Sequence, residues 1–100
     1  MPEFHLPEAL QAEYSNLVRI SHSPAEMVLD FSRILPGMTQ AEIVSRILMT
    51  PVSAKLLFRA LGDNLARYES AFGEIALPGG SSLAMHLFKN PPSPEPPEKE

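Results

Sequence analysis

One long amphipathic segment, framed by a proline and a glycine, limits the folds open to this chain more than any other part of it. Thr50 can cap a helix, and Pro51 suits the first helical position, where its missing N–H costs nothing. Gly73 can adopt the positive φ that often ends a helix. The segment therefore predicts a helix over residues 50–73, about 22 residues and roughly 33 Å long. Its apolar residues recur at spacings of four and three, and we expect them to form core: Ala54, Phe58, Leu61, Leu65, Tyr68 and Phe72.

The opposite side of this helix is charged. Its four charged residues are each four apart: Lys55, Arg59, Asp63 and Arg67. Asp63 can pair with the arginine before it and with the one after it. We therefore expect a solvated face, not a phosphate or RNA patch.

Three runs before the helix, residues 14–22, 26–35 and 41–50, have the composition or alternation of β-strands. Pro36-Gly37 fits the centre of a type II turn between the second and third runs. The connections are short, whereas a parallel pairing needs a long crossover. We therefore expect an α+β fold, an antiparallel three-stranded β-meander followed by one long C-terminal α-helix.

Alternation in the second and third runs places large aliphatic side chains on both faces of the predicted sheet. In the third run, one face would carry Ile43, Ile47 and Met49. The second sheet face would carry four apolar residues that we predict as an interface: Val28, Ile34, Val44 and Leu48.

One helix cannot cover both faces of a sheet, and an exposed aliphatic patch usually marks an interface. We therefore expect a homo-oligomer, most simply a twofold dimer, that covers the second face or extends the sheet edge. The alternative is that residues 1–13 and 75–88 of the same chain fold back over that face.

The composition divides the chain into four parts. Residues 1–13 form an N-terminal arm, and residues 14–75 form the β-β-β-α domain. Residues 76–90 form a flexible or docking segment. The last part, residues 91–100, holds five of the 11 prolines and predicts a disordered Pro/Glu tail.

The charge balance, 8 Lys and Arg against 12 Asp and Glu, gives a net charge of −4 and argues against a nucleic-acid binder. The absence of a long apolar run and of a basic-then-apolar leader predicts a cytoplasmic protein without a membrane partner. Cysteine is absent, which excludes disulfides and thiolate chemistry.

Residues that could carry chemistry are few. His5, His22 and His86 lack the spacing of a metal site. Residues 79–82, Gly-Gly-Ser-Ser, lack the lysine of a phosphate-binding loop and predict a linker. We therefore predict no catalytic, cofactor-binding or metal-binding residue, no cofactor, and no enzymatic activity.

Asp30 lies within an apolar strand and has two interpretations. It could be a buried acid with a raised pKa. We favour the second, a cross-strand ion pair with Arg19, Arg33 or Arg46.

Three stretches of the sequence resemble a small bacterial family, domain of unknown function 3467: residues 14–31, 44–57 and 61–75. The resemblance covers roughly residues 14–75. It implies a domain of about this length and no particular activity or catalytic residue. The order of three strands and a helix also resembles, at fold level, the SecB export chaperone, which forms oligomers with exposed apolar grooves.

The sequence thus favours a non-enzymatic protein-interaction module that self-associates through its sheet. One alternative is a SecB-like polypeptide-binding chaperone. A third hypothesis is a nucleic-acid-associated regulator, in which folding would gather the arginines on one side: Arg19, Arg33, Arg46, Arg59 and Arg67.

Overall fold

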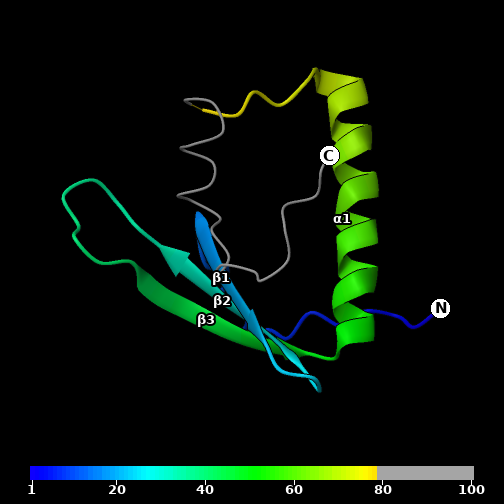
Figure 1. Cartoon of the computed structure of the whole chain (residues 1–100). Helices are drawn as coiled ribbons and strands as arrows, with labels where there is room; N and C mark the ends of the chain where they lie inside the picture. The colour runs from blue at the N-terminus through cyan, green and yellow to red at the C-terminus, as the bar shows by residue number, and fades with distance from the viewer. Residues whose placement is uncertain (79–100) are drawn as a thin grey trace.

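The computed structural model describes residues 1–78, so the predictions for residues 79–100 lie outside the described part. Four elements follow one another along the chain: β1 (Leu17–His22), β2 (Met27–Arg33), β3 (Glu42–Met49) and α1 (Pro51–Phe72). The strands form one antiparallel sheet in the order β1-β2-β3. Figure 1 shows the helix standing at one end of this sheet. The predicted fold class, a three-stranded β-meander followed by one helix, is confirmed.

The hairpin between β2 and β3 turns at the predicted site. Gly37 has a φ of 88°, which favours glycine, and the Met38 N–H donates to the Leu35 carbonyl at 3.0 Å. A proline followed by a residue with positive φ is the type II arrangement that the sequence predicted.

A β-bulge in β3 changes which residues share a face. Phe31 lies opposite Ser45, but the next residue, Ser32, lies opposite Ile43, so Val44 is an extra residue on its strand. A bulge of this kind reverses the side on which the residues beyond it point. The prediction that Ile43 shares a face with Ile47 is therefore wrong, since Ile43 lies on the side of Ser32.

The start of β1 is tied to the end of β2 through side chains. The Asn16 amide donates to the Ile34 carbonyl at 2.9 Å and accepts from the Ile34 N–H at 3.0 Å. The Ser15 hydroxyl and the Asn16 N–H both donate to the Ser32 carbonyl, at 2.8 and 3.0 Å. These bonds continue the ladder beyond the last strand residue and fix the direction in which the chain enters the sheet.

The helix begins and ends at the predicted residues. The Thr50 hydroxyl accepts from the Ser53 N–H at 3.1 Å, and Pro51 occupies the first turn. At the other end Gly73 has a φ of 99° and donates its N–H to the Glu69 carbonyl at 2.8 Å. Neither of the predicted ion pairs of Asp63 forms; the ion pairs within residues 1–78 all lie in the sheet.

The helix does not cover the sheet, and the prediction that its apolar stripe forms core is wrong. None of its residues is buried, and it touches the sheet mainly at β3, the strand it leaves. The reason is the connection: Thr50 alone joins Met49 to Pro51, which is too short for the helix to reverse across a sheet face. In the described part of the chain, the only buried apolar residue is Leu29, 8% exposed.

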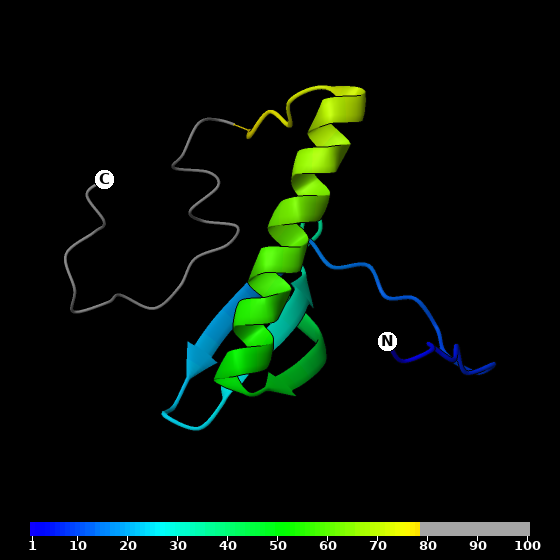
Figure 2. The same cartoon turned by 90° about the vertical axis from the view of Figure 1, so that its right-hand side faces the viewer.

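The N-terminal arm, residues 1–13, runs away from both the sheet and the helix (Figure 2). Every residue of this arm is exposed. The arm therefore leaves the second sheet face of its own chain uncovered.

Candidate functional site

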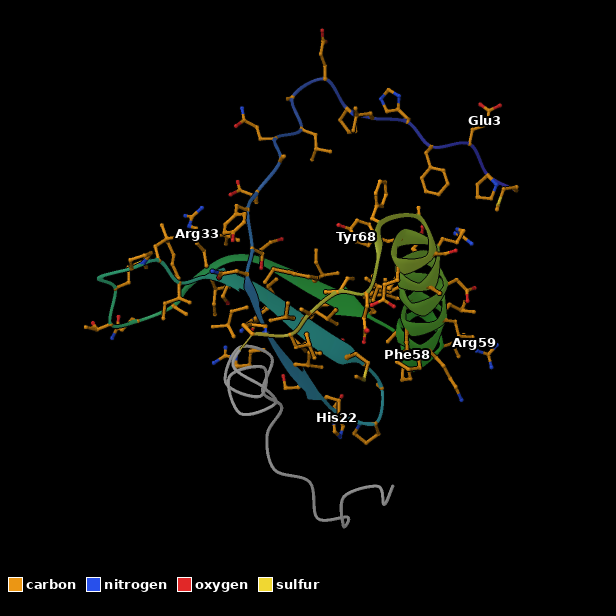
Figure 3. The ribbon with its side chains drawn as sticks, turned by 90° about the horizontal axis from the view of Figure 1, so that it is seen from above. Glu3, His22, Arg33, Phe58, Arg59 and Tyr68 are labelled. Atoms are coloured by element: carbon orange, nitrogen blue, oxygen red, sulfur yellow. The ribbon has the colours of Figure 1, made fainter. Side chains whose placement is uncertain are left out.

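A row of exposed apolar side chains runs along one side of α1. We call it the helix seam; its members are Ala54, Phe58, Leu61, Leu65, Tyr68 and Phe72. The five large members are 44–76% exposed. Their alternating spacing of four and three averages 3.5 residues, which is the period of a coiled-coil seam. Figure 3 shows Phe58 and Arg59 pointing to different sides of α1.

The seam widens near the end of the helix into an open hollow of about 680 Å³. The chain turns back after Gly73, where the Ile75 N–H donates to Glu69 Oε2 at 2.9 Å, and this turn brings Ile75 beside the helix. The rings of Tyr68 and Phe72 lie 5.0 Å apart. These side chains form an apolar surface that has no cover from residues 1–78.

A cluster of two arginines and one aspartate occupies the centre of the sheet. Arg19 and Arg46 lie directly opposite Asp30 on the two neighbouring strands. Arg46 donates from Nε to Asp30 Oδ1 at 2.7 Å, and Arg19 donates from Nη2 to Oδ2 at 2.8 Å. The two guanidinium groups leave Asp30 only 1% exposed, although their own side chains are about 60% exposed. The favoured interpretation of Asp30, a cross-strand ion pair, is confirmed, while Arg33 pairs with Glu42 instead.

These hydrogen bonds determine how Asp30 titrates. The bonds from Arg46, and then those from Arg19, lower the pKa of Asp30 from 3.8 to about 2 against the opposing effect of burial. The interpretation of Asp30 as an acid with a raised pKa is therefore wrong. A carboxylate that stays ionised between two cations serves as a counter-ion and not as a general acid.

The lowered pKa of Asp30 predicts how the stability of the fold depends on pH. A carboxylate whose pKa is lower in the folded chain than in the unfolded chain stabilises the fold. This contribution is complete at pH values above the unfolded pKa of 3.8, and it is lost as the pH falls through the folded pKa of about 2. We expect the urea midpoint of unfolding to fall over this range, and the Asp30 carboxyl carbon to titrate near pH 2 by NMR. Titration of that carbon at 3.8 would show that the cluster does not form in solution.

The four predicted interface residues do not form one continuous patch. Val28 lies directly opposite Leu48, as expected for one face, and Leu48 is exposed. Val44 is the bulge residue, and Ile34 lies beyond the end of β2; both are half-buried. The bulge instead places Ile43 on the face of Val28. The pattern of a single sequence does not reveal a bulge, so no signal in the sequence indicated this change of face.

The remaining candidates are dispersed. His5 lies in the arm and His22 at the end of β1, both exposed, while His86 and residues 79–82 lie outside the described residues. No group of three potential metal ligands occurs within residues 1–78. Of the five arginines, the sheet brings only Arg19 and Arg46 together.

Comparison with known proteins gives one match. A family model described as "Protein of unknown function (DUF3467)" matches residues 3–77. This match begins at residue 3, so it includes nearly all of the arm, which the resemblance over residues 14–75 did not. No curated protein and no solved structure matches the chain, and a likeness to SecB is not shown. In the described part, no helix has the length and apolar character needed to cross a membrane.

Proposed function

This chain belongs to the DUF3467 family, and from its geometry we propose that it is a non-enzymatic protein-interaction module that self-associates as a homodimer. The observation that carries the proposal is the helix seam, five large side chains in coiled-coil spacing with none of them buried. The module presents the sheet and its two edge strands, β1 and β3, as further binding surface.

A second copy is the partner that the seam fits best. If two helices pair antiparallel through their seams, with the twofold axis crossing the seam midway between Leu61 and Leu65, then Leu61 of one copy lies opposite Leu65 of the other. In the same arrangement Phe58 lies opposite Tyr68, and the small Ala54 lies opposite the large Phe72. Large and small side chains then alternate along the seam, which is how well-packed layers interdigitate.

The free energy gained by burying the seam is of the same order as the free-energy cost of association, so it leaves little net stabilisation of the dimer. Burying a large apolar side chain contributes about 1.5–3 kcal/mol, and the five large seam side chains are 44–76% exposed, so each can gain roughly half to three-quarters of that amount. Ten such side chains in a dimer would therefore gain roughly 10 kcal/mol, against an association cost of about 4–15 kcal/mol. A stable dimer thus needs contacts in addition to the seam.

Sedimentation equilibrium of the full chain tests the proposal. We expect a species of about 22 kDa, twice the chain mass of 11.0 kDa, at tens of micromolar protein. A mass of one chain throughout that concentration range would contradict self-association. Light scattering after size exclusion, which does not assume a globular shape, provides an independent mass.

A further inference from the structure

We infer that the N-terminal arm of each copy lies on the sheet of the other copy, over the cluster of Arg19, Asp30 and Arg46. The inference rests on the proposed dimer and names a second contact within it. The first residues of the arm, which include Glu3 and Phe4, are the occupant, and the sheet face that carries Val28 and Leu48 is the surface they cover.

The arm has the composition of a docking segment but no contact that would hold it on its own chain. Phe4, Leu6 and Leu10 are 92%, 77% and 63% exposed. Within the arm, the Leu10 N–H donates to the Pro7 carbonyl at 3.1 Å, and the first hydrogen bonds to the sheet are made by Ser15. A segment with three large exposed apolar side chains needs another surface to cover them.

The sheet face of the second copy matches the arm in charge. The arm contains three carboxylates, Glu3, Glu8 and Glu13, and no lysine or arginine. The cluster carries two guanidinium groups for one carboxylate, and each guanidinium binds Asp30 through Nε and Nη2. The two Nη1 groups make no hydrogen bond within residues 1–78, and they can donate to a carboxylate that approaches from outside.

The same face offers apolar surface around the cluster. Leu48 and Ile43 are 58% and 45% exposed on either side of Arg46, and Val28 is half-buried opposite Leu48. A hollow of about 250 Å³ lies beside Arg19, lined on this face by Leu17, Ser32 and Ile43. It can receive an apolar side chain of the arm while a neighbouring glutamate reaches an arginine.

The geometry of the arm favours the second copy over its own chain. Hydrogen bonds from Ser15 and Asn16 to β2 hold the arm in line with β1, and Figure 3 shows Glu3 far from the sheet. Thirteen extended residues span up to about 45 Å. This length exceeds by about 12 Å the roughly 33 Å of helix that would separate the two sheets of an antiparallel pair, so the first residues of the arm, around Glu3 and Phe4, are the ones that reach the partner sheet.

Cross-linking between single-cysteine variants tests the inference, because the natural chain contains no cysteine. One full-length preparation carries Phe4→Cys, and a second, with a different tag, carries Leu48→Cys. After subunit exchange and treatment with a short bismaleimide, we expect a linked pair that carries both tags. The matched control replaces Leu48→Cys by Ile47→Cys, which is the adjacent residue, is also exposed, and lies on the opposite face. We expect this control to lose the linked pair.

The outcomes separate this inference from the proposed dimer. A dimer by sedimentation that gives no linked pair between positions 4 and 48 overturns the arm inference and leaves the dimer standing. Equal linking to positions 47 and 48 also overturns it, because docking on one face would discriminate between them. A linked product within one chain of the double variant Leu10→Cys/Leu48→Cys, without one between chains, shows that the arm folds onto its own sheet. A monomer in sedimentation overturns both proposals.

Discussion

Replacing Leu65 by glutamate is expected to convert the dimer into monomers. Leu65 lies near the middle of the helix seam, where twofold pairing buries both copies of the side chain. Leu65 is 44% exposed, so losing the burial of this exposed part costs about 1 kcal/mol in each copy and weakens the dimer by about 2 kcal/mol, or roughly thirtyfold in Kd. Burial of two carboxylates would weaken it further. Sedimentation equilibrium of the variant should therefore give the mass of one chain at concentrations where the unmodified chain is dimeric.

The control for this variant is Ala60→Glu, which adds the same charge to the same helix on its exposed opposite side. We expect Ala60→Glu to remain dimeric and both variants to keep the helical circular-dichroism signal of the capped helix. A dimer that survives Leu65→Glu would show that the helix seam is not the interface, and the sheet would then be the surface to examine.

The order and bounds of the elements could be predicted from the sequence because they depend on local chemistry. Thr50, Pro51 and Gly73 define the helix through hydrogen-bond capping and allowed φ values, which do not depend on the rest of the fold. Pro36-Gly37 defines the hairpin turn in the same way. Short connections then leave an antiparallel meander as the simplest arrangement of the three strands.

The packing could not be predicted by the same reasoning. The apolar period of α1 shows that one side of the helix needs a partner, but it does not identify that partner. The one-residue connection at Thr50 prevents the helix from packing on the sheet of the same chain. This restriction is visible only once the last residue of β3, Met49, and the first residue of α1, Pro51, are known. The bulge at Val44 is a similar case, because one extra residue exchanges Ile43 between faces without altering the composition of the strand.

Which residues form the cluster at the centre of the sheet depends on the register in which the strands pair. The sequence offered Asp30 three arginine partners, and only the pairing of strands decides among them. Arg19 and Arg46 stand directly across from Asp30, whereas Arg33 lies near Glu42 at the far end of the hairpin. In this position the two guanidinium groups keep the Asp30 carboxylate ionised at the centre of the sheet.

Replacing Asp30 by asparagine is expected to give the largest loss of thermal stability among single substitutions in the sheet. Asparagine has nearly the same shape as aspartate, but it leaves the two guanidinium groups without a counter-ion. Its NH₂ group replaces an acceptor oxygen by a hydrogen-bond donor that faces the N–H donors of an arginine. The matched control is Glu42→Gln, the same change of chemistry on the same hairpin, where an exposed pair with Arg33 contributes only about 0–1 kcal/mol. We expect the Tm of Asp30→Asn to fall several times further than that of Glu42→Gln at equal protein concentration.

The Asp30→Asn variant should also lose the decline in stability that the Asp30 carboxylate causes as pH falls from 3.8 to about 2, because the titrating group is gone. Equal Tm values for the two variants would mean that the central carboxylate contributes no more than an exposed surface charge.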